Sequence, residues 1–306
     1  MQQTSNSDSE LPGADALEAV CEISGLDTTD AQLIHHRSNA VYLLPWASQH
    51  GAIARLAPDT ELRQKRARVS IAVTRWLSEQ AAEPISLLPL SGEQPVITAG
   101  AIATFWPYCP VSTPASLTDV AVLLRRLHDQ PRPPFPIPEY RPLHRLREAL
   151  ALDERRKQSA LSADDRQWIH KRADDLVDAY DSAQFPMGRG VVHADAHTEN
   201  VVLDDGEWVL IDWDQCCIGP RELDLISGLP DHFQRPDAER REFLDAYGYH
   251  LLSWPGWRLL RDIAELHSIA SYIRLAPHKP AAARQLGARV RSLRSGNRSV
   301  RWQAVP

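Results

Sequence analysis

The residue types best suited to chemistry occur between positions 191 and 212. Asp195 and Asn200 lie five positions apart, and Asp212 follows the next apolar runs. A carboxylate can accept the proton of an attacking hydroxyl, and amide and carboxylate oxygens are ligands for a hard cation such as Mg²⁺. This combination suits phosphoryl transfer, which depends mainly on positioning and on neutralising the charge of the phosphates.

The same stretch predicts a β-hairpin. A polar turn, Asp204–Glu207, separates two short apolar runs, a pattern typical of two strands joined by a tight turn. If Leu203 pairs with Trp208, Asn200 and Asp212 lie together at the open end of the hairpin. Facing residues in a hairpin are about 5 Å apart, so the amide and the carboxylate would be close enough to share a cation.

The motif around these residues resembles a known family. His-x-Asp-x-x-x-x-Asn at 193–200, Ile-Asp-Trp-Asp at 211–214 and the segment Gly219–Leu225 are similar to the aminoglycoside phosphotransferase family of protein-kinase-like enzymes. The resemblance extends over residues 30 to 300 and is most specific from 191 to 225. It implies transfer of the γ-phosphoryl group of ATP or GTP to a hydroxyl of a small molecule, with Mg²⁺ as cofactor.

The resemblance also implies roles for five residues. Asp195 would be the catalytic base, and His193 would support its loop. Asn200 and Asp212 would be the metal ligands. Asp224 would stabilise the catalytic loop from the following segment.

The elements that must position these residues differ along the chain. Its first third contains short β-like runs and one long amphipathic helix, whereas helical patterns dominate beyond residue 114. We therefore expect an α+β, bilobal, protein-kinase-like fold, with a small antiparallel sheet and one main helix before a larger, mostly helical lobe. The expected parts are a disordered tail (1–12), a nucleotide-binding lobe (13–105), a hinge (106–114) and a helical lobe carrying the catalytic loop, metal site and acceptor pocket (115–306).

Individual elements can be predicted from the same patterns. Extended runs are predicted at 32–34, 40–44, 52–56, 85–89 and 95–105, besides the hairpin. Helices are predicted at 14–24, 63–80, 117–128, 143–152, 163–180, 237–252, 257–276 and 281–293. Ser116 is a plausible N-cap for the helix that begins at Leu117.

The nucleotide side is indicated by the resemblance. Ser38 and Asn39 would lie in the loop that covers the donor phosphates, and Arg55 would contact these phosphates from a strand, since the N-terminal strands contain no lysine. A guanidinium can bind phosphate with two parallel hydrogen bonds. A plain turn and a solvated strand arginine are the alternative interpretations.

One position departs from the family pattern. The helix usually supplies a glutamate that holds the basic strand residue, and here the register gives Ser70. Either another acid such as Glu61 takes this part, or the phosphates themselves position Arg55.

The base of the nucleotide would contact a hinge and two apolar side chains. Because Pro107 has no N–H, the hinge donor must come from Trp106 or Tyr108. Ile53 and Ile211 would sandwich the base, although both would fit equally well in a core. The residues expected to bind this part of the nucleotide are thus Ile53, Phe105, Trp106, Tyr108 and Ile211.

The acceptor side is less marked. Asp231, Glu265 and His267 are candidates for an acceptor pocket in the helical lobe, and they would fit equally well on the surface of helices. The expected acceptor is an antibiotic, either an aminoglycoside or another hydroxylated type such as a nucleoside. A choline-like amino alcohol or a sugar is the alternative acceptor.

Two functions of other classes remain open. His193, Asp195 and His197 could form the site of a metal-dependent hydrolase, because imidazole and carboxylate together suit zinc. The chain could also be a nucleotide-binding pseudokinase without turnover, an interpretation motivated by Ser70.

Composition limits the remaining partners. A net charge of −6 argues against nucleic acid, which requires a basic face. No apolar run approaches the roughly 20 residues of a membrane span, and the N-terminus lacks the apolar segment of a signal peptide. Four cysteines, of which Cys216 and Cys217 are adjacent, favour free thiols over a disulfide framework. We therefore expect a cytoplasmic protein, either a monomer or a homodimer, without a membrane partner.

Overall fold

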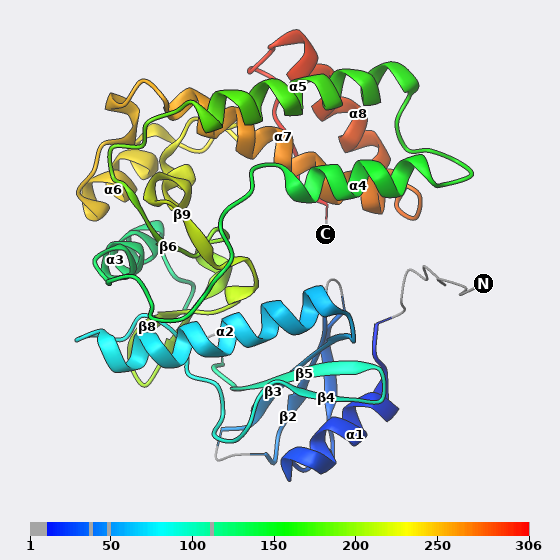
Figure 1. Cartoon of the computed structure of the whole chain (residues 1–306), viewed down its shortest axis with the longest axis vertical. Helices are drawn as coiled ribbons and strands as arrows, with labels where there is room; N and C mark the ends of the chain where they lie inside the picture. The colour runs from blue at the N-terminus through cyan, green and yellow to red at the C-terminus, as the bar shows by residue number, and fades with distance from the viewer. Residues whose placement is uncertain (1–10, 37–38, 48–49, 111–112, 306) are drawn as a thin grey trace. The chain divides into compact units, whose positions relative to one another are not determined.

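The computed structural model describes residues 11–36, 39–47, 50–110 and 113–305. Contacts divide the chain into two compact units, each made of two separate stretches. Unit 1 combines residues of 1–138 with 193–217, and unit 2 combines 139–192 with residues of 218–306. The mixture of an antiparallel sheet and a helical part confirms the predicted α+β fold (Figure 1).

Unit 1 contains a five-stranded antiparallel sheet of order β1-β2-β3-β5-β4. The predicted extended run at 95–105 is interrupted by Ala99 and Gly100, whose φ angles of 51° and 72° suit a tight hairpin turn between two strands. The strands are β1 (Gln32–His36), β2 (Ala40–Leu44), β3 (Ala52–Pro58), β4 (Val96–Thr98) and β5 (Ala101–Pro107).

The two faces of this sheet are packed differently. Ala54 and Leu56 of β3 share a core with Val20 of α1 (Ala14–Ser24). Because successive side chains of a strand point to opposite faces, Arg55 projects to the other face. The long helix α2 (Glu61–Gln80) packs against β5, and its residues Arg63, Arg66 and Ser70 line a cavity together with Arg55. The sheet thus separates an apolar layer from the face that carries Arg55.

The predicted hairpin is confirmed with its register. Strands β7 (Val201–Asp204) and β8 (Glu207–Leu210) pair with Leu203 opposite Trp208. The two turn residues, Asp205 and Gly206, have φ angles of 47° and 88°, as a type I′ turn requires.

The predicted strand at 85–89 is wrong. Ser86 forms only an isolated parallel bridge with Leu210, fixed by bonds from Leu87 N to Leu210 O (3.1 Å) and from Leu210 N to Ile85 O (2.8 Å). Prolines at both ends of this run cannot donate to a ladder, so pairing cannot extend. The segment instead joins the edge of the hairpin in unit 1.

Unit 2 is built around α7 (Trp257–Leu275), which packs against α4 (His144–Glu154), α5 (Ala163–Asp181) and α8 (Pro280–Ser295) (Figure 1). These helices share one apolar core. Two short strands that the sequence did not indicate pair with each other. Strand β6 (Arg189–Val192) lies before the hairpin in the sequence, and β9 (Cys217–Pro220) lies after it.

The other helices lie where the sequence predicts them, and one of them, α6, ends earlier than predicted. Helix α3 (Leu117–His128) begins at Ser116, whose side chain accepts a bond from Asp119 N in a complete capping box. Helix α6 (Asp237–Tyr247) stops before the predicted residue 252, because Gly248 adopts a left-handed conformation that ends the helix. Short 3₁₀ turns complete the chain: η1 (Thr198–Asn200), η2 (Trp213–Gln215), η3 (Arg221–Gly228) and η4 (Leu251–Ser253).

Two expectations from composition can be compared with the structure. All four cysteines are free. Within the described ranges, no helix has both the length and the apolar character needed to cross a bilayer.

Candidate active site

Asn200 and Asp212 both lie at the open end of the β7–β8 hairpin in unit 1. Ile211 N donates to Asn200 O at 3.0 Å, which continues the strand pairing by one step beyond Val201 and Leu210. The buried Asn200 side chain donates from Nδ2 to Asp195 O at 2.9 Å and lies 3.1 Å from His197 Nε2. These bonds close the loop from 195 to 200 on itself and fix the orientation of the amide.

Arg55 links this end of the hairpin to the sheet. Its Nη2 contacts Asp212 Oδ1 at 2.9 Å and Asp214 Oδ2 at 3.3 Å. Burial alone would raise the pKa of Asp212, but the charge and the hydrogen bond of Arg55 outweigh burial and hold this pKa below its usual value. Burial would likewise lower the pKa of Arg55, and the two carboxylates raise it instead. Both partners therefore stay charged at neutral pH.

Because Ser70 stands where the family has a glutamate, Arg55 must have another partner. The carboxylates of Asp212 and Asp214 are in contact with it. Glu61, the acid suggested as a substitute, is exposed in the first turn of α2. Asp214, two residues beyond Asp212, had no predicted role and supplies the second carboxylate.

The backbone beside the proposed catalytic residues is strained. Ala194 has φ 62° and Asp212 has φ 63°, a left-handed conformation that costs a non-glycine residue about 1 kcal/mol. Such residues concentrate where a side chain must be presented in one direction. Here Ala194 directly precedes Asp195, and Asp212 itself carries one of the proposed metal-binding groups.

His193 is a buried residue that ties the loop to the hairpin. Its side chain is fully buried, its ring lies 4.7 Å from that of Trp213, and Nε2 is 3.0 Å from Ile211 O. These contacts suit a supporting role next to Asp195, whose side chain is exposed.

The predicted nucleotide contacts are distributed over unit 1. Ser38 lies outside the described residues, and Asn39 Oδ1 accepts a bond from Arg63 Nη1 at 3.3 Å. Ile53 and Ile211 both pack against one apolar cluster, and their contact with a base stays a prediction. That cluster consists of Ile71, Leu87, Trp106 and Val209.

The main chain of the predicted hinge is already bonded at two positions. Phe105 N donates to Gln94 Oε1 at 2.7 Å, and Phe105 O accepts from Leu90 N at 2.9 Å. Its side chain lies in the core beneath α1. Tyr108 N donates to Gly51 O at 3.2 Å, so a purine would have to compete for this donor.

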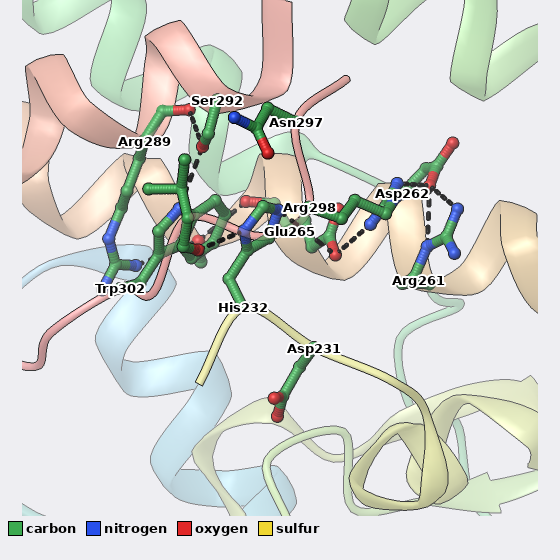
Figure 2. A network of polar contacts seen from close by, with 12 residues as sticks. Asp231, His232, Arg261, Asp262, Glu265, Arg289, Ser292, Asn297, Arg298 and Trp302 are labelled. Atoms are coloured by element: carbon green, nitrogen blue, oxygen red, sulfur yellow. Dashed lines mark hydrogen bonds and ion pairs between the residues drawn. The ribbon is translucent and has the colours of Figure 1, made fainter. Parts of the chain in front are cut away.

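The three residues predicted for the acceptor pocket lie in unit 2 and do not converge. The Glu265 carboxylate turns into a polar network with Arg298 and His232, whereas the Asp231 carboxylate points away from it (Figure 2). Burial raises the pKa of Glu265 despite the opposing charge of Arg298. His267, also on α7, has a pKa lowered to about 4 by burial and by the nearby charges of Arg145 and His144.

Asp224 is buried within η3 of unit 2. Its proposed action on the catalytic loop stays a prediction.

The metal-dependent hydrolase hypothesis finds no support in the side chains. In the part of the chain that the structure describes, no group of three or more His, Cys, Asp and Glu side chains is arranged to hold one metal ion. His193 Nε2 faces Ile211 O and His197 Nε2 faces Asn200, so the two rings serve separate contacts.

Two arginines near the site were missed from the sequence. Arg63 and Arg66 of α2 line the same cavity as Arg55 and Ser70. Their positions relative to Ser70, seven and four residues earlier, put all three on one face of a helix. That spacing was the signal that could have identified them.

The α+β fold of the chain agrees with its family. The chain belongs to the phosphotransferase enzyme family, whose sequence model matches residues 30–263. It is therefore a small-molecule phosphotransferase. No curated protein is significantly similar to it in sequence.

Solved structures with a similar fold cover nearly the whole chain. An amicoumacin kinase in complex with AMP-PNP, Ca²⁺ and Ami has a TM-score of 0.71 at 15% identity, covering 95% of this chain and 96% of the other. The microcompartment-associated aminopropanol kinase has a TM-score of 0.63 at 15% identity, with 91% and 95% coverage. A spectinomycin phosphotransferase in complex with ADP and spectinomycin has a TM-score of 0.60 at 16% identity, with 92% and 93% coverage. At these identities the likeness establishes the fold.

Proposed function

We propose that this protein transfers the γ-phosphoryl group of ATP or GTP to a hydroxyl of a small molecule, with Asp195 as the base and Asn200 and Asp212 as ligands of Mg²⁺. The observation that carries the proposal is the end of the hairpin, where Ile211 N bonds to Asn200 O and Asn200 Nδ2 bonds to Asp195 O. The first bond brings the segment that leads into Asp212 to Asn200, and the second ties the Asn200 side chain to the main chain of the exposed Asp195.

The oxygens at this end fit a hard divalent cation. Among the contacts of the described residues, Asn200 uses only its Nδ2 as donor, which leaves Oδ1 as a neutral oxygen ligand. The lowered pKa of Asp212 keeps its carboxylate charged. Amide and carboxylate oxygens are the ligands that Mg²⁺ prefers, and bound Mg²⁺ would neutralise the phosphate oxygens of the donor.

The transfer step itself needs little covalent chemistry from the protein. The acceptor oxygen would attack the γ-phosphorus while the bond to the β–γ bridging oxygen breaks, and the nucleoside diphosphate would leave with that electron pair. The hydroxyl proton would pass to the carboxylate of Asp195. Arg55 would hold donor phosphate with its guanidinium, a geometry in which two N–H groups can bind two phosphate oxygens.

The acceptor class is proposed from the neighbours of the fold. They include an amicoumacin kinase and a spectinomycin phosphotransferase, and also an aminopropanol kinase. We favour a hydroxylated antibiotic as the acceptor, with an amino alcohol as the second candidate. Turnover of ATP and of GTP with aminoglycosides, nucleoside antibiotics, spectinomycin, choline and ethanolamine as acceptors would distinguish the two classes.

Asp195→Asn tests the reaction type. The substitution removes the proton acceptor but keeps its size, so turnover should fall by about 10³-fold while binding of Mg-ATP remains nearly unchanged. Nucleoside diphosphate release and calorimetric binding of Mg-ATP are the two measurements.

Asp205→Asn is the matched control, because Asp205 lies in the turn at the opposite end of the same hairpin. Full activity of Asp195→Asn would refute the assignment of the base. Nucleotide binding without turnover for every acceptor and donor would instead support a pseudokinase.

A further inference from the structure

A cavity in unit 1 collects basic side chains on the face of the sheet opposite α1. Arg55 of β3 lines it, as do Arg63, Arg66 and Ser70 of α2 and the carboxylate-bearing Asp214. The cavity has about 360 Å³ of space including its open mouth. It is thus a small, polar and partly enclosed space.

The sequence causes this convergence in two ways. Positions 63, 66 and 70 are spaced i, i+3 and i+7, which brings them to one face of α2. Arg55 alternates with Ala54 and Leu56, whose side chains fill the core under α1, so it must project to the opposite face. Three arginines from two different elements thereby line one cavity.

The charges of the lining do not balance. Three arginines face the cavity, and Asp214 is the single carboxylate in its lining within the described residues. Asp214 already contacts Arg55 at 3.3 Å, as does Asp212 from outside the lining at 2.9 Å. Counted by residue type, three arginines stand against the two carboxylates of Asp212 and Asp214, a composition that favours an anion.

Ser70 gives an independent indication of a ligand. Its side chain is 2% exposed and lines the cavity, and its Oγ has no hydrogen-bond partner among the described residues. A buried hydroxyl without a partner is costly, and it can donate to an oxyanion. Guanidinium and hydroxyl groups together present the donors that a phosphate group accepts.

We propose that this cavity is a phosphate-binding site formed by Arg55, Arg63, Arg66 and Ser70. The phosphate could be the terminal group of the nucleotide donor, in which case the inference rests on the proposed function, or free inorganic phosphate. Both sources offer the same tetrahedral oxyanion to the same donors. In this site, Arg63, Arg66 and Ser70 of α2 would contact phosphate in addition to Arg55.

Calorimetric titration of the full chain with inorganic phosphate, at constant ionic strength and without nucleotide, tests the site. Wild-type protein should bind phosphate with a dissociation constant of about 1 mM or below. Arg66→Gln should weaken binding by about 10-fold or more, since it removes a charge-assisted hydrogen bond. Arg68→Gln is the matched control, because it changes the same charge on an exposed position of the same helix and should alter binding by less than about twofold.

Two substitutions at Ser70 give a second, independent readout. Ser70→Glu adds a carboxylate among the arginines and should abolish phosphate binding, whereas Ser70→Ala removes only the hydroxyl and should weaken it by about threefold. Thermal unfolding and circular dichroism verify that each variant is folded. No saturable binding of phosphate by the wild-type protein up to about 20 mM, or equal losses for Arg66→Gln and Arg68→Gln, would overturn the proposal.

Titrations with ATP and AMP distinguish the two sources of phosphate. If Arg66→Gln weakens ATP but leaves AMP unchanged, the site takes the terminal phosphates of the donor. If it weakens inorganic phosphate and leaves both nucleotides unchanged, the site takes the free anion. Equal weakening of AMP and ATP would contradict a phosphate-specific site. Because none of these titrations requires turnover, the site can fail while transfer through Asp195 stands, and the reverse.

Discussion

Arg55 in unit 1 and Arg289 in unit 2 are both arginines with little exposure, but their partners are of different kinds. Arg55 is 15% exposed and contacts two carboxylates, of which that of Asp212 is 37% exposed. Arg289 is 2% exposed and donates to Tyr272 Oη (2.7 Å), Gln303 O (3.0 Å) and Ser268 Oγ (3.2 Å). One guanidinium faces charged groups beside a cavity, and the other faces neutral acceptors in a closed core.

The aromatic surroundings of Arg289 extend this difference. Its guanidinium carbon lies 3.8 Å from the ring centre of Tyr272 and 4.6 Å from that of Trp302, whose own N–H donates to Ser292 Oγ (Figure 2). Burial lowers the pKa of Arg289 although Tyr272 opposes this effect. Arg289 thus fastens the segment around residue 303 to α7 and α8, whereas Arg55 and its ionic partners lie at the proposed phosphate site.

The same substitution at both arginines should separate activity from stability. Arg55→Met should lower turnover by about 100-fold or more, because it removes a donor to the phosphates. Its free energy of unfolding should change by less than about 1 kcal/mol, since the partly exposed carboxylates regain water. Turnover and urea unfolding measure the two effects. A loss of stability that parallels the loss of activity would contradict the comparison.

Arg289→Met should show the reverse pattern. Tyr272 Oη and Gln303 O would lose a buried donor, so the free energy of unfolding should fall by about 3 kcal/mol. Turnover of the folded variant should be unchanged when assayed well below its melting temperature. An activity loss at full stability would instead give Arg289 a functional part.

His267 makes the stability of unit 2 sensitive to acid. Its pKa is about 4 in the folded chain and about 6.5 in an unfolded one, so the unfolded state binds the extra proton first. Stability is therefore complete above pH 6.5 and is lost as the pH falls toward 4, by up to about 3 kcal/mol from this residue. His267→Gln should remove that part of the pH dependence in urea unfolding. Gln167→Ala, at an exposed position of α5 that carries no titratable group, is the control that should leave the pH dependence intact.

The smallest expected effect concerns the strained loop of unit 1. Ala194→Gly relieves the left-handed conformation and increases backbone freedom in the unfolded state, so the free energy of unfolding should rise by about 0.5 kcal/mol. Ala151→Gly, at an exposed position within α4, should lower it by about 1 kcal/mol. Opposite signs in thermal unfolding would confirm that the strain at position 194 is local, and equal signs would contradict it.

The hairpin was predictable because short-range chemistry determines it. Asp205 and Gly206 favour the turn, and the turn length fixes which residues face each other, so local spacing is enough to bring Asn200 and Asp212 together. The helix ends at Ser116 and Gly248 are likewise determined by the residue at that position, although only the cap at Ser116 was predicted. The strand predicted at 85–89 failed because the prolines around it prevent a ladder from extending.

The partners of Arg55 could not be derived in this way. Asp214 lies far along the chain from Arg55, and nothing in the spacing indicates that its carboxylate takes the place expected of a helix glutamate. The pairing of β6 with β9 and the contacts of Arg289 with Trp302 are likewise long-range. The helical spacing of Arg63, Arg66 and Ser70 was visible, but its meaning depended on the cavity that only the fold creates.

Because unit 1 consists of two separate stretches of the chain, its two parts are synthesised at different times. The ribosome completes residues 139–192 before it reaches the hairpin at 193–217. At about 5–20 residues per second, synthesis of residues 139–192 takes roughly 3 to 11 seconds. For that time the first stretch of unit 1 exists without the second. During that interval Ile71, Leu87 and Trp106 lack Val209, the hairpin residue that completes their cluster. Apolar surface next to the proposed nucleotide site is thus open to chaperones until the strands carrying the proposed catalytic residues emerge.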